Sequence, residues 1–466
     1  MYSWQNSDWP NYEYDTALHQ PMLLRYSEQS GRLAAISELL QAQGNDKAYI
    51  EALVDEAVNT SRIENEHLTR DDVRSSIKHF MGLIPEIKNR DLRADGIVAA
   101  LMDLRADVDS HLTHERLKIW HTQVMYGSES ILYSAPVAGE YRTAAEPMQI
   151  VSGPVGHQTV HYEAPPANQV EMEMDRFLSW YNDSATLPAP IRAAVAHLWF
   201  ETIHPFDDGN GRVGRAIAEH ALAQSIGNMP PMSLSMALEK NKHQYYPHLR
   251  DASMGESLNI DKYVGWFTKQ CIEAQVHAQA RFDMVIVKAE FWRDNSEIVT
   301  DKTQAKALNK FFDAGLNGFV NGLSSQKYAA IVGCSRATAT RHLAELTHKE
   351  VLVRLEGGGR STRYAPNTQR LFTLMPSMVP HPIYRALRAL RDEKAGRTSD
   401  ILTECFETLK AHLGKNPINP IDVPAAAQVA KLISELGDGK LYDDKLARES
   451  AMPIEFEHKV DLPIEK

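Results

Sequence analysis

The chain has 466 residues and a formal net charge of −11, which argues against a generally basic nucleic-acid coat but allows a local basic patch. It is long enough for about two to four domains with substantial cores. It has three widely spaced cysteines, no basic and apolar signal region at its start, and no run of about 18 apolar residues. Structural disulfides and a membrane partner are therefore not expected, and a cytoplasmic setting is the default.

The first predicted elements are helices that follow an aromatic start. Apolar residues recur at helical spacing from about Ala48 to Val58, which predicts an amphipathic helix. Thr60 and Glu64 lie four residues apart at the end of that helix. On its own, Glu64 is typical of a solvated carboxylate at a helix end.

Two short β-like runs further along the chain predict a hairpin. The first run consists of Gln149, Ile150, Val151 and Ser152, and the second extends from Gln158 to Tyr162. Gly153, Pro154 and Gly156 lie between the two runs and suit a turn. An ordinary surface hairpin is the plain alternative to a functional one.

A helix–loop–helix segment follows. Ile191 to Ile203 repeats apolar residues at helical intervals after Pro190, and Pro205 ends that helix. Helical spacing returns from Val213 onward. The connecting segment packs one base, two acids, two arginines and a glycine-rich turn into twelve residues: His204, Pro205, Phe206, Asp207, Asp208, Gly209, Asn210, Gly211, Arg212, Val213, Gly214 and Arg215.

These residue types at this spacing suit phosphate chemistry. Backbone N–H groups of residues 209–211 can converge at the start of the second helix, where the helix dipole favours an anion. Arg212 and Arg215 share one face of that helix and can bind a polyphosphate. Asp208 can ligate Mg²⁺, and His204 can take a proton from an attacking hydroxyl. The segment therefore predicts nucleotidyl or phosphoryl transfer.

Each part of this segment also has a plainer interpretation. A histidine after a buried helix is usually a core or capping residue, a Gly-Asn-Gly stretch is usually a turn, and an arginine pair is usually a solvated face. A metal cluster of His204, Asp207 and Asp208 is a further alternative, although Pro205 and the short spacing make convergence on one ion awkward. The conjunction of all these residues favours transfer chemistry.

Residues 296–370 have the pattern of a winged helix. Predicted helices at 326–332 and 336–348 flank a turn at 333–335, and two strands follow around the glycines at 357–359. From Asn321 to Arg370 there are eight Lys or Arg against three Glu, an excess that a phosphate-facing surface needs. Arg336 and Arg341 are the predicted DNA-contacting residues. Protein docking or dimerisation is the alternative use of such a module.

The segment from His204 to Arg215 resembles the signature of the Fic (Fido) family, His-Pro-Phe-x-Asp/Glu-Gly-Asn-Gly-Arg-x-x-Arg, at every fixed position. Fic proteins are mostly adenylyltransferases, which move AMP from ATP to a Ser, Thr or Tyr hydroxyl of a protein and release pyrophosphate. The resemblance implies ATP and Mg²⁺ as cofactors, with His204 as general base and Asp208 as the metal ligand. It also implies nucleotide contacts from Gly209, Asn210, Gly211, Arg212, Gly214 and Arg215.

Other segments resemble further parts of this family. The hairpin resembles a flap that holds a target segment by main-chain pairing. Tyr245 and Tyr246 resemble a tyrosine pair beside the adenosine, for which core aromatics are the alternative. Residues 60–65 resemble the inhibitory motif Ser/Thr-x-x-x-Glu-Gly/Asn, by which Glu64 would pair with Arg215 and obstruct the γ-phosphate of ATP. In some members the same glutamate also assists removal of AMP, so the chain could be bifunctional.

We therefore predict a mainly α protein. It has an N-terminal helical domain with the inhibitory helix at 1–85, a Fic core with a β-hairpin flap at 86–290, a winged-helix domain at 296–370, and a helical extension without assigned function at 371–466. Residues 1–85 resemble the N-terminal domain of one bacterial Fic subfamily.

The predicted function is protein adenylyl transfer held back by Glu64. One alternative is a DNA-binding transcriptional regulator whose Fic core senses nucleotide. Another alternative is a phosphotransferase like the toxin branch of the family. In the motif of that branch, Ala and Lys occupy the positions of Gly209 and Gly211, so this alternative fits less well. Possible partners are a target protein with a hydroxyl side chain, the chain itself as a target, DNA, and a second copy in a homodimer.

Overall fold

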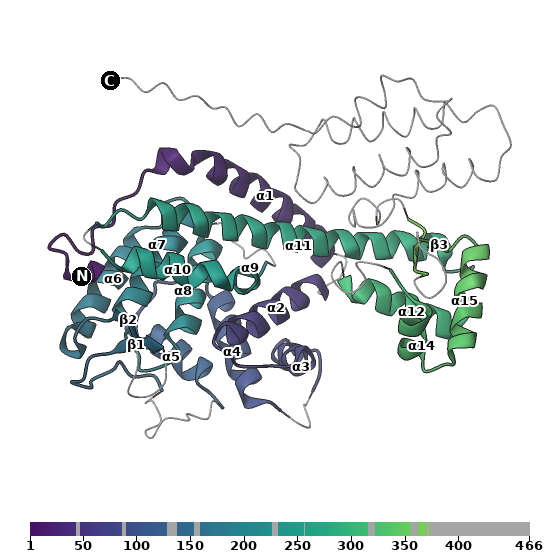
Figure 1. The fold of residues 1–466 in the computed structure, drawn as a ribbon, viewed down its shortest axis with the longest axis horizontal. Coiled ribbons are helices and arrows are strands. Elements are labelled where there is room, and N and C mark those ends of the chain that lie inside the picture. The colour runs from purple at the N-terminus through teal and green to yellow at the C-terminus, as the bar shows by residue number, and fades with distance from the viewer. Residues whose placement is uncertain are drawn as a thin grey trace, which may run out of the picture. The chain divides into compact units, whose positions relative to one another are not determined.

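The structure is a computed structural model that describes residues 1–42, 47–85, 90–127, 138–152, 159–225, 232–255, 257–315, 322–355, 362–368 and 371. Within these residues the fold is helical with two small antiparallel hairpins, which confirms the predicted mainly α class (Figure 1). The chain divides into two compact units, Met1–Phe282 and Asp283–Lys466. The predicted turn at 153–158, the glycines at 357–359 and the extension after 371 lie outside the described residues. No helix in the described segments has the length and apolar character needed to cross a membrane.

The first unit contains most of the helices in the described segments. In chain order its elements are η1 (Ser3–Gln5), α1 (Thr16–Ala42), α2 (Lys47–Ile63), α3 (Arg70–Phe80), α4 (Leu92–Ala106), α5 (His114–Val124), β1 (Gln149–Ser152), β2 (Thr159–Glu163), η2 (Ala167–Gln169), α6 (Val170–Asp183), α7 (Ala189–Ile203), α8 (Asn210–Gln224), α9 (Leu234–Lys240) and α10 (Lys242–Ser253). α11 (Asp261–Asn295) begins in this unit and ends in the second.

α7 and α8 form the centre of the first unit. Every residue of α7 is buried, as is every residue of α8 from Arg212 to Ala223. A helix that is buried all round must be enclosed by other helices, and these two pack on each other and on α4, α5 and α6. Pro190 lies in the first turn of α7, where its missing N–H leaves no helical bond unmade. The connection between α7 and α8 is therefore anchored at both ends in the core.

α2 lies beside this centre and packs against α3, α4 and α9. Ala52, Leu53, Val54, Ala57 and Val58 of α2 are all buried. The apolar stripe predicted from about Ala48 is thus the packing face of the helix. Consequently, the residues that follow the end of α2 are held close to the core.

The second unit has its own core. Its elements after α11 are α12 (Lys302–Asp313), α14 (Ser325–Val332), α15 (Arg336–His348), β3 (Leu352–Arg354) and β4 (Tyr364–Pro366). Phe311, Tyr328, Leu343 and Leu346 are buried together in this core. β3 pairs antiparallel with β4, with Val353 opposite Ala365. The bounds predicted for the second helix are those of α15, and the winged-helix assignment itself stays a prediction.

Candidate nucleotide-binding site

His204 stands where α7 ends. Its backbone is left-handed, with φ 51° and ψ 59°, and its N–H donates to the carbonyl of Phe200 at 2.9 Å. A left-handed residue stops a helix because the following N–H groups can no longer reach the preceding turn. The His204 carbonyl accepts from Arg142 Nε at 2.8 Å. The backbone of the candidate base is thus fixed from both sides.

The surroundings of His204 favour its neutral form. Burial and the nearby Arg142 guanidinium lower the pKa of His204 to about 4. Glu201 Oε2 lies 4.0 Å from His204 Nδ1. Burial raises the pKa of Glu201 to about 8. At neutral pH both groups are therefore uncharged, and the imidazole is able to accept a proton.

The loop after His204 ends in a helix N-terminus without a side-chain cap. Gly209 is the N-cap of α8 with φ 78°, and it makes no side-chain cap hydrogen bond to the first turn. A Cβ at Gly209 would lie 2.9 Å from Met125 Sδ, so both the backbone angle and the space require glycine. Asn210 braces the loop, because its Oδ1 accepts from Phe206 N and its Nδ2 donates to Phe206 O. The uncapped N–H groups of α8 favour an anion at this point.

Arg215 points from α8 toward the end of α2. Its side chain is only 1% exposed, and Nη2 lies 2.8 Å from Glu64 Oε1. Nε donates to Thr60 Oγ1 at 2.8 Å, and Nη2 donates to the Thr60 carbonyl at 3.0 Å. Burial lowers the pKa of Arg215, but the Glu64 carboxylate, together with Tyr245 and Glu201, holds the pKa above its ordinary value. The structure thus brings together the two residues whose pairing the sequence resemblance implies.

The Glu64 carboxylate lies directly against the first turn of α8. A Cβ placed on Gly211 would collide with Glu64 Oε1 and would lie 3.0 Å from Arg215 Nη1. Gly211 therefore leaves room for an anionic group between the helix N-terminus and the guanidinium. Glu64 occupies that room with a carboxylate, which accepts hydrogen bonds much as a phosphate does.

Arg212 is held by a second carboxylate. Its side chain is 3% exposed, and Nη1 lies 2.9 Å from Glu66 Oε2. Nη1 also donates to the carbonyl of Val124 at 3.1 Å. Both arginines of the motif are therefore paired with a glutamate from the segment after α2. Sequence reasoning missed Glu66, which lies 146 residues from its partner and carries no local signal.

Asp208 is exposed beside the N-terminus of α8. Its Oδ1 accepts from Gly209 N at 2.6 Å, and its carbonyl lies 3.0 Å from His121 Nε2. The described residues contain no group of three or more His, Cys, Asp or Glu that could hold a metal by itself, so the alternative cluster of His204, Asp207 and Asp208 does not form. One exposed carboxylate suits Mg²⁺, which completes its shell with phosphate oxygens and water.

The β1–β2 hairpin lies at the end of α7. Gln149 pairs with Glu163, Ile150 pairs with Tyr162, and the register shifts between Ile150 and Val151, which precedes Ser152. Tyr162 donates to the Thr202 carbonyl at 2.6 Å, two residues before His204. In the described part of the chain β1 pairs only with β2, and no described strand pairs with its other edge.

The two tyrosines of the predicted pair differ in exposure. Tyr245 is 1% exposed, and its hydroxyl lies 2.9 Å from Nε2 of the buried His197. This tyrosine is buried and packs between His197 of α7 and Trp266 of α11, and its contact with a nucleotide stays a prediction. Tyr246 is 44% exposed and donates to the Ile63 carbonyl at 3.2 Å. Only Tyr246 is open at the end of α2.

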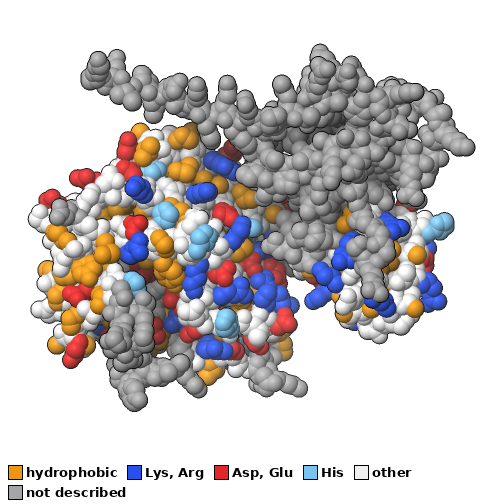
Figure 2. Space-filling model, in the orientation of Figure 1, with side chains coloured by type: hydrophobic (Ala, Val, Ile, Leu, Met, Phe, Trp, Pro, Cys, Tyr) orange, Lys and Arg blue, Asp and Glu red, His pale blue; other side chains and the backbone are white. Residues whose placement is uncertain are grey.

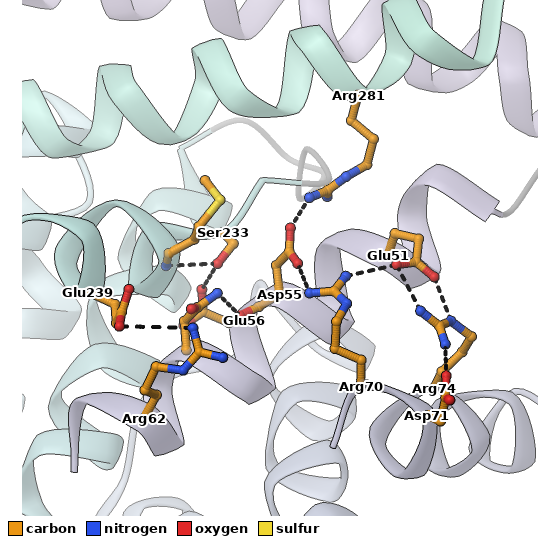
Figure 3. A network of polar contacts seen from close by, with 12 residues as sticks. Glu51, Asp55, Glu56, Arg62, Arg70, Asp71, Arg74, Ser233, Glu239 and Arg281 are labelled. Atoms are coloured by element: carbon orange, nitrogen blue, oxygen red, sulfur yellow. Dashed lines mark hydrogen bonds and ion pairs between the residues drawn. The ribbon is translucent and has the colours of Figure 1, made fainter. Parts of the chain in front are cut away.

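Carboxylates of α2 fasten this helix to its neighbours (Figure 3). Glu56 is buried and accepts from Ser233 Oγ at 2.8 Å and from Ser235 N at 2.9 Å, at the start of α9. Asp55 bonds both Arg281 of α11 and Arg70 of α3. The position of Glu64 therefore depends on polar contacts along the whole helix as well as on its apolar face.

Two segments of the chain match known family models. Residues 111–222 match the Fic/DOC family, and residues 2–83 match a domain of unknown function, DUF4172. Protein adenylyltransferase fic-1 of Caenorhabditis elegans is 32% identical over 108 residues, which cover 23% of this chain and 20% of that protein. Protein adenylyltransferase Fic of Culex quinquefasciatus is 29% identical over 116 residues, covering 24% and 22%. The chain thus matches about a fifth of the length of these relatives.

Solved structures of Fic proteins are similar at low sequence identity. A Fic family protein from Desulfovibrio desulfuricans G20 aligns with a TM-score of 0.43 at 18% identity, covering 77% of this chain and 98% of that one. Fic-1 from Caenorhabditis elegans, residues 134–508, aligns with a TM-score of 0.40 at 22% identity, covering 57% and 73%. Residues 111–222 therefore match the Fic/DOC family, and the relatives that share this part of the chain are named as protein adenylyltransferases.

Proposed function

We propose that this chain transfers AMP from ATP to a Ser, Thr or Tyr hydroxyl of a protein, and that Glu64 restrains the reaction. The proposal is supported chiefly by the 2.8 Å contact between Glu64 Oε1 and Arg215 Nη2 at the uncapped start of α8. An arginine that pairs with a carboxylate beside a helix N-terminus is equally suited to hold a phosphate. A site that only stabilised the fold would have no need of a histidine beside it.

The roles of the side chains follow from their chemistry. His204, neutral at pH 7, accepts the proton of the target hydroxyl as the hydroxyl oxygen attacks the α-phosphorus and pyrophosphate leaves. Arg215, the first turn of α8 and Gly211 bind the phosphates. Asp208 would hold Mg²⁺, which neutralises charge on the phosphates. The edge of β1 away from β2 holds an extended segment of the target near His204.

The inhibition follows from competition for Arg215. Glu64 and the γ-phosphate of ATP need the same guanidinium, so the nucleotide binds without its productive phosphate geometry while the ion pair is closed. A displacement of about 1 Å at the reacting atoms can lower a rate by about a hundredfold. Resting transfer by the wild-type chain is therefore expected to be slow.

The test uses α-labelled and γ-labelled ATP with Mg²⁺ and follows label on the protein itself. We expect α-label to accumulate in Glu64→Gly and in the nearly isosteric Glu64→Gln, at rates at least about tenfold above wild type. The label should disappear in Glu64→Gly/His204→Ala. Transfer of γ-label alone would make the reaction a phosphorylation and contradict the proposal.

Two further outcomes separate the alternatives. If ATP binds and no variant transfers label, the Fic core is a nucleotide sensor in a regulator. Loss of α-label from modified protein after ATP is removed, in wild type but not in Glu64→Gly, would assign AMP removal to Glu64. The intact His204 favours transfer over sensing, because a sensor needs phosphate contacts but no base.

A further inference from the structure

The second unit presents two helices joined by a tight turn. Ser324 caps α14 by accepting from Lys327 N at 3.1 Å, and α14 ends at Gly333, whose φ of 79° turns the chain. Ser335 caps α15 by accepting from Thr338 N at 3.1 Å. Tyr328 of α14 is fully buried, and its hydroxyl lies 2.9 Å from His342 Nδ1 of α15. The two helices therefore have a fixed mutual orientation, as a helix-turn-helix requires.

The two faces of α15 differ completely. Ala339, Leu343 and Leu346 are buried and share the inner face. The opposite face is exposed and is formed by Arg336, Ala337, Thr340, Arg341 and Ala344. The side chains at 337, 340 and 344 are small, so Arg336 and Arg341 are the long side chains of this face, and Arg336 Nε lies 3.5 Å from Ser325 Oγ at the start of α14. A face with small side chains allows a partner to come close to the helix and to both guanidinium groups.

The charges around this face favour an anionic partner. Residues 322–355 and 362–368 contain six Lys or Arg and two Glu, in a chain with a net charge of −11. One of the two, Glu345, already pairs with Lys349 at 2.7 Å near the end of α15. The following hairpin adds Arg354 and Arg363. Lys and Arg side chains gather on the visible face of this unit (Figure 2).

Apolar docking is disfavoured at this unit. None of the large hydrophobic side chains that are exposed in the described part of the chain lies between residues 302 and 368. Protein interfaces have an apolar or aromatic centre, whereas nucleic-acid interfaces are polar and strongly positive. A B-form major groove about 12 Å wide admits a helix, while the corresponding groove of double-stranded RNA is too deep and narrow for side chains to read.

We propose that the outer face of α15, with Arg336 and Arg341, is a docking surface for double-stranded DNA. Arg336 and Arg341 insert into the major groove or bind phosphates at its edge, and the β3–β4 hairpin contributes Arg354 to the flanking backbone. The Tyr328–His342 contact and the buried face of α15 hold the surface in shape. This activity is separate from AMP transfer, because no residue of the nucleotide site takes part in it.

The experiment measures fluorescence anisotropy of a labelled duplex of about 30 base pairs, of mixed sequence, titrated with the full chain at about 50 mM salt. We expect binding in the micromolar range or tighter, weakening as salt is raised. Arg336→Ala/Arg341→Ala should bind at least about tenfold more weakly, with a shallower salt dependence. The matched control is Lys302→Ala/Lys306→Ala, which removes two exposed charges from α12 of the same unit and should stay within about twofold of wild type.

Several outcomes would overturn the proposal. These are absence of duplex binding by wild type, equal binding by wild type and the arginine variant, or equal weakening by the arginine and lysine pairs. So would a change of oligomeric state in the arginine variant, measured by sedimentation, without any duplex binding by wild type, since this face would then be a protein contact. His204→Ala should bind the duplex as wild type does, so failure of AMP transfer leaves this test intact.

Discussion

His204 and Glu201 lie together at the end of α7, where their side chains are 13% and 8% exposed. Their pKa values move in opposite directions because burial disfavours the charged form of each, to about 4 for His204 and to about 8 for Glu201. Neither group therefore carries charge at neutral pH. Two predictions at the scale of single residues follow from this assignment.

The first prediction concerns the pH profile of AMP transfer in Glu64→Gly. A base with a pKa of about 4 is already deprotonated at pH 6, so kcat/KM should stay level from about pH 6 to 7.5 and fall below about pH 5. Glu64 raises the pKa of His204 in the wild-type chain, so its removal shifts the acid limb further down. An acid limb centred near pH 6.5 would mean that His204 is solvated rather than buried. Arg142→Lys, which retains the positive charge, is the matched control.

The second prediction concerns the stability of Glu201→Gln. Between an ordinary pKa of 4.5 and a folded pKa of about 8, the unfolded chain is ionised at Glu201 while the folded chain is not. Wild type therefore loses stability as pH rises through this window, by up to about 1.4 kcal/mol per unit from this group, and levels off above it. Glutamine lacks this loss.

Calorimetry at pH 5, 6, 7 and 8 checks this second prediction. The Tm of Glu201→Gln should rise relative to that of wild type as the pH increases. Exposed Glu171→Gln is the control and should show no such trend. A constant Tm difference between Glu201→Gln and wild type across the series would show that the carboxyl is ionised in the folded chain.

At the scale of elements, α2 is fastened differently to the core and to α3. Glu56 bonds Ser233 and Ser235 at the start of α9, whereas Glu51 bonds Arg70 and Arg74 of α3. Of these two sets of contacts, only those of Glu56 connect α2 to α9, which follows α8 in the chain. The two glutamates therefore form a matched pair for testing how the position of α2 controls Arg215.

We expect Glu56→Ala to increase AMP transfer in a chain that keeps Glu64. The substitution leaves buried donors at α9 unpaired, which costs about 1–3 kcal/mol in the closed arrangement. Each 1.4 kcal/mol lost from the closed arrangement relative to the open one raises the open fraction about tenfold. The measurement is the initial rate of α-label incorporation.

Glu51→Ala is the control for this substitution and should leave the rate within about twofold of wild type, because its partners lie on α3. If Glu56→Ala lowers the Tm without raising the rate of α-label incorporation, a shift of α2 does not free Arg215 from Glu64. Equal stimulation by both variants would implicate α3 as well.

Local patterns in the sequence predict elements better than they predict partners. Pro190 and Pro205 bound α7 closely, and Ser335 with Gly333 defines the turn before α15, because these residues act on their own backbone. Glu64 was found only through a motif resemblance. Its pairing with Arg215 depends on how α2 packs, which no local spacing encodes.

Arg142 and Glu66, two site residues that sequence reasoning missed, are held by long-range contacts. Arg142 lies 62 residues before the carbonyl it bonds at His204, and Glu66 lies 146 residues before Arg212. Tyr245 is another such case. The family resemblance predicts that it lies beside a nucleotide, but two adjacent tyrosines in a sequence do not indicate that one of them is buried against His197. Tertiary packing decided these cases.

At the scale of the whole molecule, the chain has two units with separate cores. Leu198 is buried in the first unit and Leu343 in the second. We expect calorimetry to resolve two unfolding transitions. Leu198→Ala should lower one and Leu343→Ala the other, each by about 2–5 kcal/mol of unfolding free energy. A single transition moved by both substitutions would show that the units unfold together.

The left-handed backbone of His204 determines how substitutions at this position affect the stability of the protein. A non-glycine residue in that conformation costs roughly 1–2 kcal/mol, a strain that glycine would relieve. His204→Gly should therefore melt at a higher temperature than His204→Ala. Under the proposed function, selection for stability would favour glycine at this position, and selection for a base would oppose it. A descendant without AMP transfer would then be free to lose the histidine while keeping its fold.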